Sequence, residues 1–243
     1  DKAFGTLSVN QRSLLQDNNI GKLTLGTGEV LDRYDYISMS AGNKSQFGVM
    51  RGNKGLYWYD TLNMIIYRYG DGLEPLSKLK GLNSYITKYY TDRDAYCIGV
   101  FDSQYNECVF TLNTLSRTET IPFSEITDSF GPFYDFSPTR YIQAYDSTYS
   151  TTNNNFTVYL HNRESADKAR FYGVLYPSTI KFVINENPTI TKTFSSVEYK
   201  SRSYNSSNIP LFNDTFNTIS IYNDKQYSGV VNIVTNDALS TWN

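Results

Sequence analysis

"GLYWYDTLNMIIYRYG", residues 55–70, contains two apolar, aromatic-rich runs separated by a short polar break. In the second run, the alternation places Ile66 and Arg68 on one side of an extended chain and the residues around them on the other. Asp60 and Asn63 lie in the break and are residue types that tight turns favour. The stretch therefore predicts a β-hairpin.

The composition extends this prediction to the whole chain of 243 residues. Tyrosine (22) and phenylalanine (14) are abundant, and only 19% of the residues are charged. Aromatic residues favour the pleated surface of a sheet, and the polar residues between the apolar runs favour turns. We therefore predict a mainly β fold of antiparallel hairpins in a propeller-like or irregular multi-sheet array with one short helix.

A weak internal repeat supports the array. Three segments each consist of a strand, a polar turn and a second, aromatic-rich strand, and these segments are residues 47–60, 97–112 and 142–162. Their second strands begin about 50 residues apart, a period typical of propeller blades or an irregular solenoid.

One segment has helical periodicity, residues 74–92. Its apolar residues follow the three-and-four spacing of an amphipathic helix, and they are Leu76, Leu79, Leu82, Ile86 and Tyr89. Pro75 stands at the expected start. Gly81 weakens the helix by roughly 1 kcal/mol relative to alanine.

We divide the chain into a β-rich, repeat-like region, residues 1–200, and a long loop with a terminal β-hairpin, residues 201–243. The boundary lies at the start of "KSRSYNSSNIPLFNDT", residues 200–215, which is rich in serine and asparagine. We expect the second region to continue the same assembly.

The net charge is −2 and the pI is near 5.5, whereas nucleic-acid-binding proteins usually carry an excess of basic residues. No direct nucleic-acid partner is therefore predicted. No apolar stretch approaches the roughly 20 residues of a membrane-spanning helix, so no membrane segment is predicted.

Cys97 and Cys108 flank the turn at residues 102–106. If the hairpin is centred on Gln104, Cys108 faces Val100, and a disulfide with Cys97 would need a shift of register. We expect two small buried thiols, with a disulfide as the alternative.

The order of several motifs resembles a known family. The motifs are "LGTGEVL", "ISMSAGNKSQFGVMRGNKGLYWYDTLNMIIYRYG", "LSKLKGLNSYI", "YNECVFTL", "TIPFSEITDSFGPFYDFSPTRYI", "VYLHN" and "ARFYGVLYPSTIKFVIN". In this order they resemble the large tail proteins of crAss-like bacteriophages, most closely the muzzle proteins that close the distal tail. The resemblance covers roughly residues 20–200, and its weight comes from the shared order of the motifs.

This resemblance implies a β-rich structural component of the virion, present as an oligomer in the tail. It supplies no catalytic motif. Proteins of this kind are much longer than 243 residues, so we expect the chain to be one fragment or domain of such a protein.

The residues themselves offer few reactive sites. The single histidine, His161, has no Gly-framed nucleophile near it in the sequence, and "SKLK", residues 77–80, lacks the companion motifs of a Ser-x-x-Lys enzyme. Gly26 and Gly28 lack the third glycine of a dinucleotide site. One histidine, two distant cysteines and "DGLE", residues 71–74, do not match a zinc or calcium pattern. We therefore predict no catalytic, cofactor-binding or metal-binding residues and no cofactor, with a calcium ion held by loop carboxylates as the alternative.

A glycosidase is the enzyme alternative, because such a site needs two carboxylates about 5–10 Å apart, often beside aromatic rings. The candidate carboxylates are Asp60, Asp71, Glu74, Asp128 and Asp135, and the neighbouring aromatic residues are Trp58, Tyr69, Phe133 and Tyr134. A carbohydrate-binding module with exposed tyrosines is the other alternative. Tyrosines covered by neighbouring chains would instead favour assembly.

The prediction as a whole is a non-enzymatic structural component of a phage tail, located in the virion. Its predicted partners are copies of itself in a ring-like homo-oligomer and other tail proteins. The alternative is a carbohydrate-binding or polysaccharide-degrading tail module. Trp58 is expected to supply core or interface surface.

Overall fold

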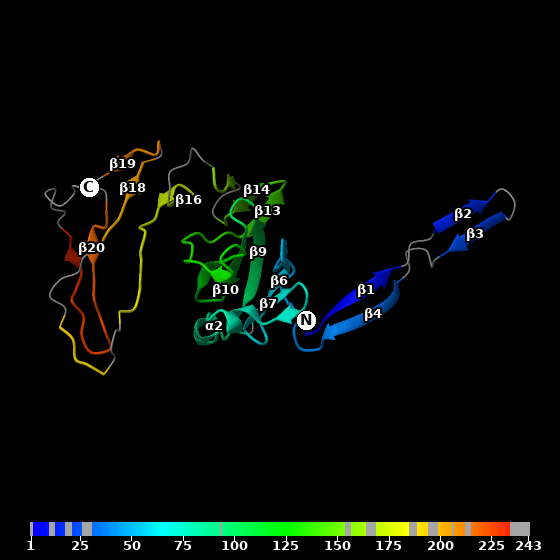
Figure 1. The fold of residues 1–243 in the computed structure, drawn as a ribbon, viewed down its shortest axis with the longest axis horizontal. Helices are drawn as coiled ribbons and strands as arrows, with labels where there is room; N and C mark the ends of the chain where they lie inside the picture. Colours follow the sequence, from blue (N-terminus) through cyan, green and yellow to red (C-terminus); the bar gives the residue numbers. More distant parts are fainter. Residues whose placement is uncertain are drawn as a thin grey trace. The chain divides into compact units, whose positions relative to one another are not determined.

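The structure is a computed structural model that describes residues 2–9, 13–17, 21–25, 31–92, 94–153, 157–163, 169–184, 189–193, 199–205, 207–211 and 215–233. The chain forms two compact units, Asp1–Arg163 and Glu164–Asn243. The strands pair in antiparallel sheets, which confirms the predicted mainly β fold (Figure 1). The boundary predicted at residue 200 falls inside the second unit and stays a prediction.

The predicted hairpin at residues 55–70 forms the centre of a four-stranded sheet. The strands of this sheet, in spatial order, are β5 (Val49–Gly52), β6 (Gly55–Asp60), β7 (Ile65–Tyr69) and β8 (Leu73–Glu74). Asp60 closes the β6–β7 turn, where its Oδ1 accepts hydrogen bonds from the backbone N–H groups of Leu62 and Asn63 at 2.9 and 3.1 Å. This confirms the turn residues that the sequence predicts.

Both faces of this sheet are covered by apolar side chains. Tyr57, Tyr59 and Ile66 on one face belong to the main hydrophobic cluster of the first unit. Trp58 and Tyr67 on the other face belong to a second cluster. Because successive side chains of a strand point to opposite faces, the aromatic run of β6 supplies both clusters.

A second four-stranded sheet completes the main cluster. Its strands, in chain order, are β9 (Tyr96–Asp102), β10 (Glu107–Asn113), β11 (Thr118–Ser124) and β12 (Ser129–Phe130). The two sheets approach closely at Gly99 of β9, where a Cβ atom would lie 1.9 Å from the Cε of Met50. Gly99 also donates a backbone hydrogen bond to the carbonyl of Phe47 at 2.9 Å. Glycine at this position therefore permits the contact between the sheets.

The register of the β9–β10 hairpin differs from the prediction by one residue. Cys108 pairs with Phe101, and Cys97 pairs with Leu112, because the turn spans four residues between Asp102 and Glu107. Both cysteines are buried and free, as expected. Burial raises the pKa of both thiols.

The prediction of a single helix is wrong in one respect. The segment forms two short helices, α1 (Leu76–Leu79) and α2 (Asn83–Tyr89). Gly81 lies between the two helices with φ of 78°. This left-handed conformation is accessible to glycine and ends the first helix. Leu76 and Ile86 still bury their side chains in the main cluster. Among the described residues, no helix combines the length and the apolar character that crossing a membrane requires.

The break at Gly81 gives a testable stability effect. We expect Gly81→Ala to lower the free energy of unfolding by about 1 kcal/mol, because alanine is strained at positive φ. A Cβ atom at Gly81 would meet nothing within 4 Å, so steric clash does not contribute. Gly72→Ala is the matched control, because this position is also open but is not at positive φ. Equal stabilities of the two variants in urea denaturation would contradict the explanation.

The third predicted hairpin contains an additional strand. Residues 142–162 lie within a three-stranded sheet of β13 (Arg140–Ala144), β14 (Ser147–Thr151) and β15 (Val158–Leu160). The first turn falls at Tyr145 and Asp146, and Tyr145 has φ of 54°. Tyr141 joins this sheet to the second one through a 2.7 Å hydrogen bond between its hydroxyl and that of Thr111.

Two-stranded ribbons precede the sheets. They consist of β1 (Phe4–Val9) paired with β4 (Leu31–Ser38), and β2 (Ser13–Asp17) paired with β3 (Gly21–Leu25). Phe4 anchors the first ribbon, because its ring lies 4.7 Å from that of Trp58 and 4.9 Å from that of Tyr69.

The second unit has short strand pairs. These are β16 (Arg170–Phe171) with β17 (Val174–Leu175), β18 (Ser203–Tyr204) with β19 (Pro210–Leu211), and β20 (Thr218–Ile219) with β21 (Val231–Asn232). Not one of the side chains whose burial is described in this unit is buried. The described part of the second unit therefore has no hydrophobic core of its own.

Candidate functional site

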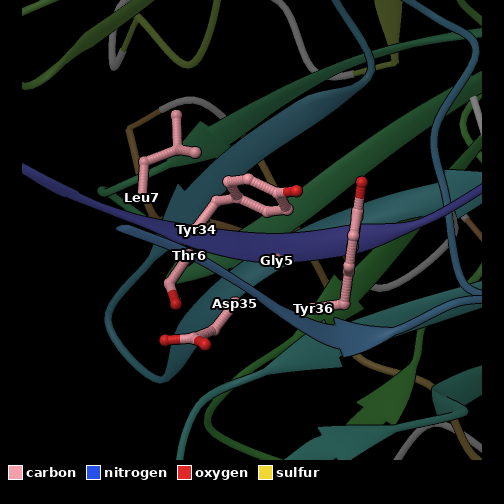
Figure 2. Close-up of a pocket in the computed structure, with 6 residues that line it drawn as sticks. All are labelled: Gly5, Thr6, Leu7, Tyr34, Asp35 and Tyr36. Carbon is pink, nitrogen blue, oxygen red and sulfur yellow. The ribbon is translucent and has the colours of Figure 1, made fainter. Parts of the chain in front are cut away.

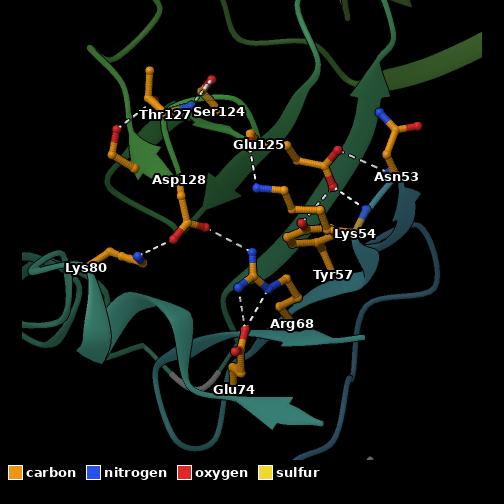
Figure 3. A network of polar contacts seen from close by, with 11 residues as sticks. Asn53, Lys54, Tyr57, Arg68, Glu74, Lys80, Ser124, Glu125, Thr127 and Asp128 are labelled. Atoms are coloured by element: carbon orange, nitrogen blue, oxygen red, sulfur yellow. Dashed lines mark hydrogen bonds and ion pairs between the residues drawn. The ribbon is translucent and has the colours of Figure 1, made fainter. Parts of the chain in front are cut away.

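A network of polar side chains lies where the β11–β12 turn of the second sheet meets the first sheet (Figure 3). We call Glu125 and Asp128 of this turn, together with the groups they contact, the polar joint. Glu125 is only 4% exposed. Its Oε1 accepts hydrogen bonds from the Tyr57 hydroxyl at 2.7 Å and from the Lys54 backbone N–H at 2.9 Å. Its Oε2 accepts a hydrogen bond from the Asn53 backbone N–H at 3.1 Å.

The first sheet is shaped to receive this carboxylate. A Cβ atom at Gly52 would lie 2.5 Å from Oε1 of Glu125, so a side chain at this position would force the carboxylate to shift. Lys54 also donates its Nζ to the backbone carbonyl of Glu125 at 2.5 Å. Burial, followed by the hydrogen bond to Glu125, raises the pKa of the Tyr57 hydroxyl, which therefore acts as a donor. The buried carboxylate of Glu125 thus joins the β11–β12 turn to the β5–β6 turn, which contains Asn53 and Lys54.

Arg68 of β7 forms the other half of the polar joint. Its Nε and Nη2 each lie 2.6 Å from Oε2 of Glu74, and its Nη1 donates to Oδ1 of Asp128 at 3.0 Å. Lys80, just after α1, binds the second oxygen of Asp128. The hydrogen bond from Lys80 is the main reason that the pKa of Asp128 is lowered. These contacts tie β7, β8 and the end of α1 to the β11–β12 turn.

This geometry brings together two of the carboxylates that were candidates for a glycosidase site, but each of them forms an ion pair with a basic side chain. Glu74 and Asp128 both bind Arg68. A glycosidase needs one carboxyl group with a raised pKa to protonate the leaving oxygen. The pKa of Asp128 shifts in the opposite direction. The arrangement is suited to holding two sheets together and not to acid catalysis.

The other candidate residues lie elsewhere in the first unit. Asp60 caps its turn and also accepts a hydrogen bond from the Gly42 backbone N–H at 3.2 Å, whereas Asp71 and Asp135 are exposed. Trp58 is 2% exposed and so offers no face for sugar stacking. Phe133 and Tyr134 also have other contacts: Phe133 lies edge-on to Tyr85 at 5.1 Å, and Tyr134 donates to Glu107 at 2.7 Å.

The sequence patterns did not predict one pair of residues, Ser150 and His161, that resembles the serine–histidine pair of a nucleophilic site. His161 Nε2 lies 2.6 Å from the hydroxyl of Ser150, and the charge of Asp102 also acts on the imidazole. The pairing of β14 with β15 brings Ser150 and His161 together, a contact that only the strand register reveals. Ser150 is 0% exposed, so a substrate does not reach its hydroxyl. The arrangement is a partly buried hydrogen bond.

His161 makes stability depend on pH. Burial lowers its pKa, and the nearby charge of Asp102 only partly opposes this. A histidine in an unfolded chain has a pKa of about 6.5, so the unfolded state binds the proton more tightly. We expect the free energy of unfolding to be greatest above about pH 6.5 and to fall as the pH decreases toward the folded-state pKa.

The matched control is His161→Gln, which can still hydrogen-bond to Ser150 but does not titrate. Because the chain contains a single histidine, urea denaturation at several pH values should show a smaller loss of stability below pH 6.5 in this variant. Equal pH dependence of the two proteins would contradict the assignment.

The remaining sequence motifs have structural positions. Ser77 is buried and accepts a hydrogen bond from the Ile66 backbone N–H at 3.1 Å, while Lys80 binds Asp128. Gly26 and Gly28 lie outside the described residues. Across the part of the chain that the structure describes, no three histidine, cysteine, aspartate or glutamate side chains form a group that could hold a metal ion.

Exposed aromatic side chains lie on the β1–β4 ribbon, where six residues line a surface depression (Figure 2). Tyr34 and Tyr36 are 62% and 60% exposed, and Leu7, which pairs with Tyr34, shares their face. The two tyrosine rings meet edge to face, with centroids 5.7 Å apart. Thr6 and Asp35 point to the other side of the ribbon (Figure 2). This face offers an exposed tyrosine pair to the predicted alternative of sugar binding, and Tyr222 and Tyr227 form another exposed pair, with ring centroids 6.5 Å apart.

Comparison with known proteins gives a consistent assignment. Residues 1–154 match the family model described as Crassvirus muzzle protein, and residues 166–237 match the model described as Crassvirus muzzle protein C-terminal domain. The chain is also 22% identical over 232 residues to the "Muzzle protein" of Bacteroides phage crAss001, covering 93% of this chain and 16% of that protein. The chain thus spans about a sixth of the length of this relative. Because the family models together cover most of the sequence, the chain belongs to the Crassvirus muzzle protein family.

Proposed function

We propose that the chain is a non-enzymatic structural component of a bacteriophage tail, and that it builds or closes the distal tail, the muzzle. In this proposal it is located in the virion and contacts copies of itself in a ring-like homo-oligomer as well as other tail proteins. Membership of the muzzle protein family supports the structural role.

The polar joint is the observation that carries the proposal within the structure. Its charged side chains, which include two candidate catalytic carboxylates, bind one another between two sheets. A rigid connection between β-sheets is the property that a load-carrying tail component needs.

A cryo-EM reconstruction of the native phage particle tests this proposal. A symmetric ring of this chain at the distal tail would support it, and the copy number would follow directly. A chain at the periphery of the particle, with a carboxylate-lined groove open to solvent, would overturn it. So would cleavage of host polysaccharide by the purified chain.

Carbohydrate binding is a second candidate function, and the exposed pair Tyr34 and Tyr36 favours it. Exposed tyrosine rings can stack on the apolar faces of sugars. Binding of the purified chain to host polysaccharide, measured by calorimetry and lost in Tyr34→Ala, would support this function. Undiminished binding by Tyr34→Ala would remove the ribbon from consideration.

A further inference from the structure

The second unit, Glu164–Asn243, contains many apolar residues but buries none of those whose burial is described. Ordering a residue costs roughly 1–2 kcal/mol of backbone entropy, and burial of apolar surface is the main term that offsets this cost. The strand pairs of the described part are two residues long, and isolated strand pairs are marginally stable in water. The described part of the unit therefore gains no stability from burial of its own apolar side chains and would gain it from a covering surface.

The apolar surface available is large enough for a stable interface. Fifteen large apolar or aromatic side chains of this unit are exposed. At roughly 100 Å² each, they offer on the order of 1,500 Å², whereas a standard interface buries about 800 Å² on each partner. These side chains are spread over residues 174–231, and a contact that uses about half of their surface reaches the size of a standard interface.

One segment concentrates this surface. Ile180, Phe182 and Ile184 alternate along the chain and are 67%, 68% and 54% exposed, and Val183 between them is 88% exposed. The segment belongs to none of the described strands, but in an extended chain Ile180, Phe182 and Ile184 share one apolar face, with Lys181 and Val183 on the other. A sheet face of this kind packs against a similar apolar face.

The charge of the unit is compatible with a partner identical to itself. Residues 164–243 contain seven lysine and arginine residues and seven aspartate and glutamate residues, which gives a formal net charge of zero. Two copies of a neutral unit approach each other without net repulsion. The apolar segment itself contains a single charged residue, Lys181.

We propose that the second unit is an association module, completed by the second unit of another copy of this chain, with Phe182 and its apolar neighbours at the contact. This proposal rests on the proposed function and names the part of the chain through which copies associate. Folding of this unit is then coupled to association, so its order depends on protein concentration.

Sedimentation velocity and amide hydrogen exchange of the full chain, over a roughly hundredfold range of concentration, test the proposal. We expect association of the wild type, with protection of residues 169–184 that increases with concentration. Phe182→Asp should weaken association by roughly 100-fold or more, since it places a charge in an apolar contact. Amides of the two four-stranded sheets should keep their protection, which shows that the first unit remains folded.

Leu115→Asp is the matched control, because Leu115 is 97% exposed but belongs to the first unit. It should leave association unchanged. A monomeric wild type, or association that survives Phe182→Asp, would overturn the proposal. If copies associate through the first unit instead, the association module is wrong but the structural role in the tail stands. If cryo-EM shows that the chain is absent from the tail, the structural role itself is wrong.

Discussion

Trp58→Ala should lower the free energy of unfolding by about 3–5 kcal/mol, the range found for removal of large buried aromatic side chains. Trp58 is 2% exposed, stacks on Tyr67 at 5.7 Å and contacts Phe4 at 4.7 Å. Its removal leaves a cavity on one face of the first sheet and takes away the surface on which Phe4 anchors the β1–β4 ribbon. Urea denaturation followed by circular dichroism measures the effect.

Tyr145→Ala is the control for this substitution, because Tyr145 is 99% exposed in the turn between β13 and β14. Exposed substitutions away from special contacts usually change stability by less than about 0.5 kcal/mol. A loss of less than 1 kcal/mol in Trp58→Ala would contradict the placement of the indole in the core. Hydrogen exchange would additionally show greater loss of protection in β1 and β4 than in β10.

Glu125→Ala should lower the free energy of unfolding by about 3 kcal/mol, because it leaves several donors without their acceptor. These donors are the backbone N–H groups of Asn53 and Lys54 and the hydroxyl of Tyr57. A buried donor without a partner costs roughly 1–3 kcal/mol, and entry of water into the space reduces the total. The effect is expected although Glu125 lies in a turn, where substitutions are usually mild.

Glu125→Gln keeps the shape of the side chain and one acceptor oxygen, so its stability should lie between those of the wild type and Glu125→Ala. Asp71→Ala, which removes an exposed carboxylate, should have little effect. If Glu125→Ala were as stable as Asp71→Ala, the β11–β12 turn would not hold the two sheets together.

The sequence predicts local features of this fold well. The hairpin at residues 55–70 follows from alternation and from Asp60, whose role in the turn needs only residues two or three positions away. The division of the predicted helix at Gly81 shows the limit of this approach. Its apolar spacing indicates a helix, but the left-handed backbone of one glycine, favoured by the packing of both helices on the same cluster, interrupts it.

The polar joint could not be predicted from the same patterns. Glu125 contacts residues about 70 positions earlier in the chain, and nothing in "FSEITDSF" distinguishes it from an ordinary solvent-exposed turn residue. The same holds for Ser150 and His161, because a shift of one residue in strand register would separate them. Charged residues that flank the turns of facing sheets are the one available signal, and they do not specify their partners.

The main hydrophobic cluster, which the two four-stranded sheets share, also affects how the chain folds during translation. All strands of the first sheet pair with neighbours in the chain, so the sheet can form as soon as residues 49–74 have left the ribosome. Its Tyr57, Tyr59 and Ile66 are covered only in part, by Leu76 and Ile86 of the two helices, until β9–β11 follow. During that interval the nascent chain displays an aromatic sheet face at high local concentration on neighbouring ribosomes. We therefore expect translation pauses before residue 124 to increase aggregation, and pauses after it to have little effect.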